Sequence, residues 1–244
     1  MIRRDNGISY YQQLSEILID QIKSGTFRPG NRLPSEMDLS KNYKLNRHTV
    51  RQAVEILQEE GFIYKIKGKG TFVANKKVPY KVSKKTRFTT SILAAGLNPD
   101  AKLLTSYEIT AGTRFSRRLG ITPSDKVTVL EILRFTDNIP FCYTTSFLSS
   151  GRFPGLTDLL EGSFSLYRLL KEHFGVEALR ASSSFEVSMP EDPDMEILQT
   201  SQKVPLLVVK SVSKDSEGNI VEYCATKFRG DFCSVTVDFN GEGR

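Results

Sequence analysis

Residues 30–73 read GNRLPSEMDLSKNYKLNRHTVRQAVEILQEEGFIYKIKGKGTFV, and this stretch decides the fold of the first part of the chain. Ser35 is followed three positions later by an acidic residue, a capping box that predicts a short helix over 35–41. After a tight connection, Asn46 is suited to cap a second helix over 47–60, which a glycine ends. Two capped helices joined in this way predict a helix-turn-helix.

The second of these helices has two contrasting faces. A narrow apolar face is formed by Val50, Ala53, Val54 and Leu57. The opposite side carries His48, Arg51 and Gln52, while Arg47 and Thr49 flank the first turn. Residues 62–73 alternate apolar with basic or polar residues around a glycine-rich turn, which predicts a β-hairpin with lysines at its tip. Such a hairpin is a wing that can reach the backbone or minor groove of DNA.

Charge is distributed unevenly along the chain. Residues 1–90, which include an amphipathic helix predicted over 10–23, hold 18 Lys and Arg against 8 Asp and Glu. Residues 91–244 hold 16 against 20. A basic helix alone is more often a solvated face than a DNA reader. The complete order of elements, together with a basic first third, favours a polyanionic partner, double-stranded DNA.

The run from Gly30 to Val73 resembles the winged-helix domain of the GntR regulator family, with a match over about residues 8–75. The resemblance implies base and phosphate contacts from the start of the recognition helix and from the helix before it. The matching positions are Ser35, Glu36, Asn46, Arg47, His48, Thr49 and Arg51. In the wing, Lys67 and Gly68 match and Lys69 lies beside them. We expect Arg47 and Arg51 to make bidentate contacts to guanine or phosphate.

The chain divides into a DNA-binding domain over 1–75, a linker over 76–86 and a larger domain over 87–244. The linker is rich in lysine, and its lysines are equally consistent with phosphate contacts and with a plain solvated tether. The larger domain lacks the regular strand–helix period of a parallel sheet, which predicts an α+β fold around a mainly antiparallel sheet. Strands are expected at 101–110, 126–136, 140–148, 180–189, 204–214 and 220–239. Helices are expected from Thr89 or Thr90 to Ala95 and at 113–119, 165–174 and 193–199.

The order of these elements resembles the effector-binding domain of the HutC branch of GntR regulators, which has a chorismate-lyase-like fold. The motifs that carry the resemblance include RFT at 87–89, LRFTDNIP at 133–140, SLY at 165–167 and FRGD at 228–231. Within the branch, RFTTSIL, NRHTVRQAV and IPFCYTTSFL are most similar to regulators of phosphonate-utilisation operons. The resemblance implies a ligand-responsive regulator, a repressor by default, that binds DNA as a homodimer.

Effector-binding residues follow partly from chemistry and partly from the resemblance. A guanidinium beside a helix N-terminus is suited to bind an anion. The residues we expect to contact the effector are Arg87, Phe88, Thr89, Thr90, Arg134, Ser165 and Tyr167. Each has a structural alternative: Arg134 could pair with Glu131 or Asp137, Ser165 could only cap its helix, and Tyr167 could fill the core. Many branch members carry Glu where this chain has Thr144, which argues against a contacted sugar hydroxyl or ammonium.

These features leave a phosphonate or phosphate-like anion as the expected effector, with a sugar phosphate or small carboxylate as alternatives. A chorismate-lyase-like enzyme is a remote alternative, because the sequence shows no paired-acid, nucleophile–base or metal motif. Three scattered cysteines and two histidines predict no metal site and no cofactor. No apolar run approaches the ~20 residues that span a bilayer, and the N-terminus lacks a signal-peptide core, so we expect a cytoplasmic protein.

Overall fold

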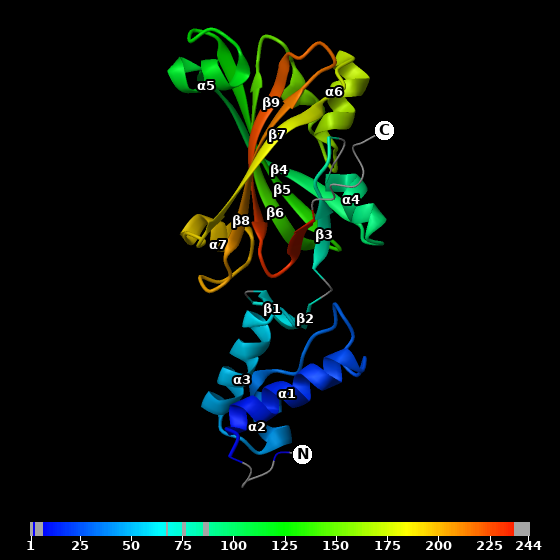
Figure 1. The fold of residues 1–244 in the computed structure, drawn as a ribbon, viewed down its shortest axis with the longest axis vertical. Helices are drawn as coiled ribbons and strands as arrows, with labels where there is room; N and C mark the ends of the chain where they lie inside the picture. Colours follow the sequence, from blue (N-terminus) through cyan, green and yellow to red (C-terminus); the bar gives the residue numbers. More distant parts are fainter. Residues whose placement is uncertain (1, 3–6, 67, 75–76, 85–87, 237–244) are drawn as a thin grey trace. The chain divides into compact units, whose positions relative to one another are not determined.

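The computed structural model describes residue 2 and residues 7–66, 68–74, 77–84 and 88–236 (Figure 1). Contacts divide the chain into two compact units. Unit 1 comprises Met1–Lys77, Met189–Pro205 and Gly230–Phe232. Unit 2 comprises Val78–Ser188, Leu206–Arg229 and Cys233–Arg244. Of the described residues, no helix is long and apolar enough to cross a membrane.

Unit 1 contains a winged helix-turn-helix, as the sequence predicts. Its elements are α1 (Tyr10–Lys23), α2 (Glu36–Tyr43), α3 (Arg47–Glu59), β1 (Ile63–Ile66) and β2 (Gly70–Val73), with α7 (Asp192–Ile197) from the later segment. The apolar face of α3 packs into a core whose fully buried members include Leu14, Leu18, Leu39, Val50 and Leu57. Strands β1 and β2 pair antiparallel, and the rings of Tyr64 and Phe72 stack across them at 5.6 Å.

Local hydrogen bonds fix the ends of the two central helices. The Ser35 hydroxyl accepts from the Asp38 backbone N–H while the Asp38 carboxylate accepts from the Ser35 backbone, so the predicted capping box is confirmed. The Asn46 side chain accepts from the Thr49 backbone N–H at 2.9 Å and caps α3. Between the helices, Lys44 takes the left-handed conformation at φ 52°, which makes the tight turn.

Replacing Asn46 with alanine should lower the free energy of unfolding of unit 1 by about 1 kcal/mol, because the first turn of α3 loses its cap. Asn46→Gly is the matched control and should cost only a few tenths of a kcal/mol, since glycine is itself a tolerated cap. Urea unfolding followed by far-UV circular dichroism measures both variants. Equal losses for alanine and glycine would contradict the capping role.

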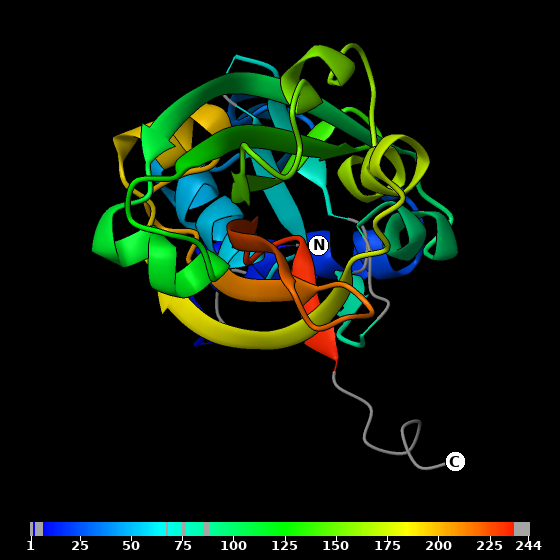
Figure 2. The ribbon, with the colours of Figure 1, turned by 90° about the horizontal axis from the view of Figure 1, so that it is seen from above.

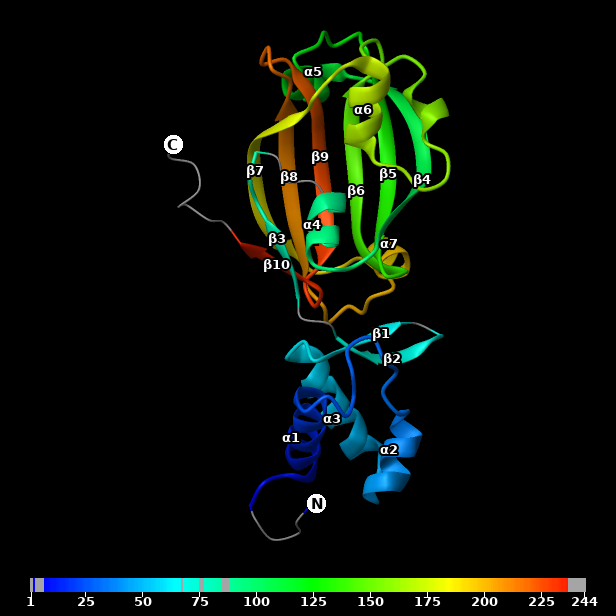
Figure 3. The ribbon, with the colours of Figure 1, turned by 90° about the vertical axis from the view of Figure 1, so that its right-hand side faces the viewer.

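Unit 2 is built on a six-stranded antiparallel sheet in the order β4-β5-β6-β9-β8-β7. Its strands are β4 (Pro99–Thr110), β5 (Lys126–Thr136), β6 (Ile139–Ser149), β7 (Leu179–Ser188), β8 (Leu206–Lys214) and β9 (Ile220–Arg229). Seen from above, the sheet is strongly curved (Figure 2). Helices α4 (Phe88–Ala94) and α6 (Leu166–Phe174) lie on one face and α5 (Gly112–Leu119) at one end (Figure 3). The predicted α+β class with a mainly antiparallel sheet is therefore confirmed.

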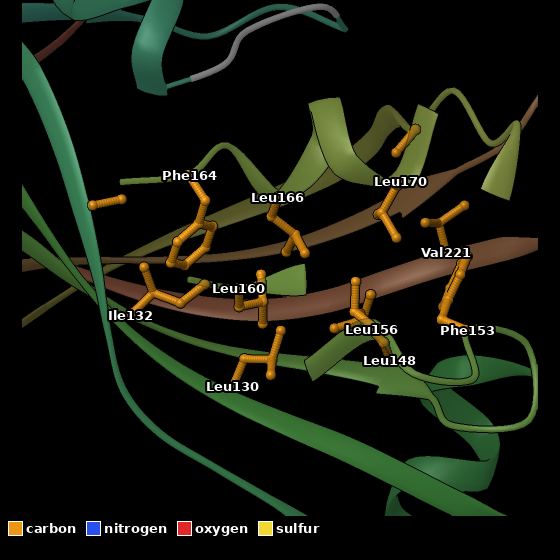
Figure 4. Close-up of a cluster of buried hydrophobic side chains, with 12 residues drawn as sticks. Leu130, Ile132, Leu148, Phe153, Leu156, Leu160, Phe164, Leu166, Leu170 and Val221 are labelled. Carbon is orange, nitrogen blue, oxygen red and sulfur yellow. The ribbon is translucent and has the colours of Figure 1, made fainter. Parts of the chain in front are cut away.

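The main core of unit 2 lies between α6 and the sheet. Figure 4 shows Leu166 and Leu170 of α6 among side chains from the sheet and from the segment that contains the short 3-10 helix Leu156–Leu159, which the sequence does not predict. This packing fixes the start of α6 against the sheet.

The turn between β5 and β6 has positive φ at Asp137 and Asn138, as expected of a two-residue hairpin.

One further pair of strands differs from the sequence-based expectation. Residues Val78–Lys81, inside the predicted linker, form β3 and pair in parallel with β10 (Cys233–Thr236). The physical reason is alternation: Val78 and Tyr80 are buried although lysines flank them. The strand expected over 220–239 is likewise two strands, because β9 ends at Arg229 before Gly230 and Asp231.

Candidate DNA-binding surface and effector pocket

The N-terminal turn of α3 presents its basic residues to solvent. Arg47, His48 and Arg51 are exposed, while Val50 is fully buried and anchors the helix from behind. The polar groups of Asn46 and Thr49 are engaged with each other, since the Thr49 hydroxyl also donates to Asn46 at 3.1 Å. Exposed cations on a rigidly capped helix are suited to contact base edges and phosphates.

Glu36 lies beside these cations and organises two of them. Its carboxylate accepts from Arg51 Nε at 3.4 Å and from Lys65 Nζ at 3.2 Å. This geometry places the Arg51 and Lys65 side chains on a common surface, on either side of Glu36.

A groove joins the start of α2, the exposed side of α3 and the wing. Its lining contains the predicted residues Ser35, Glu36, Arg47, Arg51 and Gly68. It also contains two cations that the sequence analysis missed, Arg32 and Lys65. His48 does not line this groove, Lys69 is exposed in the wing, and Lys67 lies outside the described residues.

The Arg32 side chain packs closely against the wing, at a position where only glycine leaves room for it. Gly70 has φ +114°, and a Cβ there would lie 2.7 Å from Arg32 Nε. Arg32 also forms an isolated backbone bridge with Phe72. The signal in the sequence was a basic residue directly before the LPSE stretch, with glycines at positions 68 and 70 of the wing.

Unit 2 contains a cavity of about 210 Å³ between the curved sheet and the helices α4 and α6. It brings together five of the predicted effector residues: Phe88, Thr89, Arg134, Ser165 and Tyr167. Thr90 is exposed and does not line the cavity. Arg87 lies outside the described residues.

Arg134 projects from β5 into this cavity. Its Nη1 donates to the Thr144 hydroxyl, which is linked to Thr226 at 3.0 Å, and its guanidinium lies 5.6 Å from the centre of the Phe88 ring. Over the described ranges, no ion pair joins Arg134 to Glu131, Asp137 or another carboxylate. The cation is therefore oriented by neutral groups and retains its capacity to bind an anion.

Ser165 occupies the N-cap position of α6, but its side chain makes no capping hydrogen bond. The capping alternative is therefore not realised. The Ser165 hydroxyl lines the cavity at the N-terminus of a nine-residue helix, where the dipole favours negative charge.

Tyr167 is tied to a carboxylate that the sequence analysis missed. Its hydroxyl donates to Glu222 at 2.5 Å and lies 2.9 Å from the Ser213 hydroxyl. Burial, followed by the nearby Glu222 charge, raises the pKa of Tyr167 well above its ordinary value, so the phenol stays protonated. The replacement of Glu by Thr144 on β6 therefore does not leave the pocket without a carboxylate, because Glu222 on β9 supplies one.

Arg180 and Tyr80 are two further lining residues that the sequence analysis did not single out. Arg180 comes from β7 and donates from Nη2 to the Tyr80 hydroxyl at 2.9 Å. The only sequence signal was a lone arginine at the start of a strand otherwise rich in serine and apolar residues.

A winged helix with an exposed basic groove, together with a sheet domain that encloses a polar cavity, defines a DNA-binding regulator with a small-molecule sensor. The chain belongs to the gntR family of bacterial regulatory proteins, which it matches over residues 10–73, and it carries a UTRA domain over residues 94–233. It is a transcription regulator of the HutC type, and the relatives with which it aligns are named as regulators.

Individual relatives are similar over almost the whole chain. The HTH-type transcriptional repressor NagR of Bacillus subtilis is 28% identical over 232 residues, covering 94% of each protein. The probable transcriptional regulator PhnF of Escherichia coli is 26% identical, covering 93% of this chain and 94% of its own. The crystal structure of PhnF from Mycobacterium smegmatis, at 24% identity, superposes with a TM-score of 0.67 over 95% of this chain and 99% of that one. This last likeness concerns the fold.

Proposed function

We propose that the protein is a repressor that binds a near-palindromic operator as a homodimer and is released from it by a small anion carrying a phosphonate or phosphate-like group. It would act in the cytoplasm and control genes for phosphonate uptake or metabolism. The similarity to the probable transcriptional regulator PhnF of Escherichia coli supports this gene class.

The observation that carries the proposal is Arg134. It lines the cavity beside Ser165 and the start of α6, and among the described residues no carboxylate pairs with it. A partly buried cation without a counterion is costly, and an oxyanion that accepts from the guanidinium offsets that cost.

A sugar phosphate is the second candidate effector, and Glu222 favours it. The carboxylate lines the same cavity and is 3% exposed. With one oxygen engaged by Tyr167, it retains acceptor capacity for a hydroxyl or ammonium group. Phosphate at Arg134 and hydroxyl at Glu222 would use two lining residues of the same pocket.

Ligand-dependent release requires that the effector bind the DNA-free conformation more tightly than the DNA-bound one, because a ligand with equal affinity for both shifts nothing. The coupling free energy in such systems is typically about 1–3 kcal/mol, which corresponds to a change in DNA affinity of roughly 5- to 150-fold.

Fluorescence anisotropy with DNA from the promoter beside the protein's own gene tests this function. The titration is repeated with inorganic phosphate, methylphosphonate, 2-aminoethylphosphonate, glucosamine 6-phosphate and a small carboxylate. We expect a phosphonate to weaken DNA binding about tenfold or more. Release by the sugar phosphate alone would establish the second candidate, and DNA binding that no anion changes would overturn anion-dependent release.

A further inference from the structure

We propose that Arg180 is a second anion-binding residue of the effector pocket, so that the effector is a dianion held between Arg134 and Arg180. This inference rests on the proposed function and narrows its ligand class. The dianion carries its two charges either on one doubly ionised phosphoryl or phosphonyl group or on two separate acidic groups.

The first support is the incomplete hydrogen bonding of Arg180. Its Nε and Nη1 are fully enclosed and have no hydrogen-bond partner among the described residues. Only Nη2 has a side-chain partner there, the neutral Tyr80 hydroxyl. Buried N–H groups of a cation cost free energy unless acceptors meet them, and the charged oxygens of an anion are the strongest acceptors for a guanidinium.

The second support is the absence of a counterion. Over the described ranges, no ion pair joins Arg180 to a carboxylate. Glu222 lines the same cavity, but its hydrogen bond goes to Tyr167. The guanidinium is instead held in place by Tyr80, whose ring centre lies 5.6 Å from it and whose hydroxyl accepts from it. Arg180 is oriented, therefore, without being neutralised.

The third support is that the two arginines converge from distant strands. Arg134 lies on β5 and Arg180 on β7, with β6, β9 and β8 between them in the sheet order. The sheet is strongly curved (Figure 2), and both arginines are in the lining of one cavity although their strands are far apart in the sheet order. Burial raises the pKa of the Cys224 thiol, and the charges of both arginines act against that shift, so both fields reach the same point of the cavity wall.

Tyr80 explains how a cation can remain in this position before a ligand arrives. The Tyr80 side chain is 4% exposed and its ring packs 5.0 Å from the ring of Phe228. It therefore gives Arg180 a rigid, neutral partner. Removing its hydroxyl should loosen the guanidinium without removing the charge.

Isothermal titration calorimetry on the full-length protein tests the inference with three probes. Methylphosphonate and phosphonoacetate can carry two or more negative charges, while the monomethyl ester of methylphosphonate carries one. We expect Arg180→Gln to weaken the first two about 30-fold, the effect of losing a hydrogen-bonded charge, and to change the affinity for the ester less than threefold. Tyr80→Phe should give a smaller loss in the same direction. A preference for phosphonoacetate over methylphosphonate would assign the two charges to separate groups.

Arg117→Gln is the matched control, because it removes one positive charge from an exposed position on α5 that does not line the cavity. If Arg180→Gln does not fold, Arg180→Lys replaces it in the same titrations. Lysine keeps the positive charge but loses the planar guanidinium, so the affinity for the dianions should still fall. Unchanged affinity for the dianions in the folded variant would overturn the role of Arg180. If the affinity for the dianions still depended on Arg134, the proposed function would stand. If the unmodified protein bound none of the three anions, both would fall.

Discussion

Replacing Arg134 with alanine is expected to weaken binding of an anionic effector at least 100-fold. The guanidinium reaches the cavity from β5, where Thr144 and the ring of Phe88 hold it. A hydrogen bond to a charged group contributes about 1.5–3 kcal/mol, so the loss of two such bonds amounts to about 3–6 kcal/mol. Isothermal titration calorimetry measures the change directly.

The same substitution should leave folding and DNA binding nearly intact. In the described part of the chain Arg134 has no ion-pair partner to be left unpaired, and Thr144 keeps its hydrogen bond to Thr226. Thr144→Val serves as a control, because it removes the group that orients Arg134 and should cost less affinity than the arginine itself. An Arg134→Ala protein that still binds the effector normally, and still releases DNA in response, would contradict the assignment.

Replacing both Arg47 and Arg51 with alanine is expected to reduce operator affinity by roughly 30-fold to 20,000-fold. Both side chains are exposed and line the groove between α3 and the wing. Each bidentate contact from arginine to guanine contributes about 1–3 kcal/mol of discrimination, so two contacts account for about 2–6 kcal/mol. Fluorescence anisotropy at several salt concentrations provides the measurement.

The salt dependence separates two kinds of contact. If the arginines neutralise phosphates, the slope of log affinity against log salt becomes shallower by about one for each arginine removed. If they read bases, the slope stays the same and sequence discrimination falls. Arg28→Ala, an exposed arginine outside the groove, is the control. Unchanged operator affinity in the double variant would show that the N-terminal part of α3 does not contact DNA.

Local signals predicted much of this protein. The caps at Ser35 and Asn46 and the apolar spacing along α3 each depend on residues within a few positions, so the winged helix was predicted nearly to the residue. The alternation of Val78 and Tyr80 was a signal of the same kind, but the surrounding lysines masked it, and β3 was missed.

The pocket was only half predictable because its walls come from strands that are distant in sequence. Arg134, Ser165 and Tyr167 lie in recognisable motifs. Glu222 enters through the pairing of β9 with β6, and Arg180 through the curvature that brings β7 round. Neither the order of the strands nor the curvature of the sheet can be predicted from a short stretch of sequence. The position of a single arginine on a serine-rich strand therefore did not indicate that it lines the pocket.

The open sheet also has consequences for local unfolding. Strands β4 and β7 are its two edges, and both contribute to the cavity wall, through Ala101 and Arg180. Edge strands open locally more readily than central ones, since each is paired on one side only. A ligand that contacts both edges joins the two ends of the sheet, much as strand pairing closes a barrel. Bound effector would therefore protect the backbone amides of β4 and β7 from hydrogen exchange together, while β6 and β9 at the centre would change little.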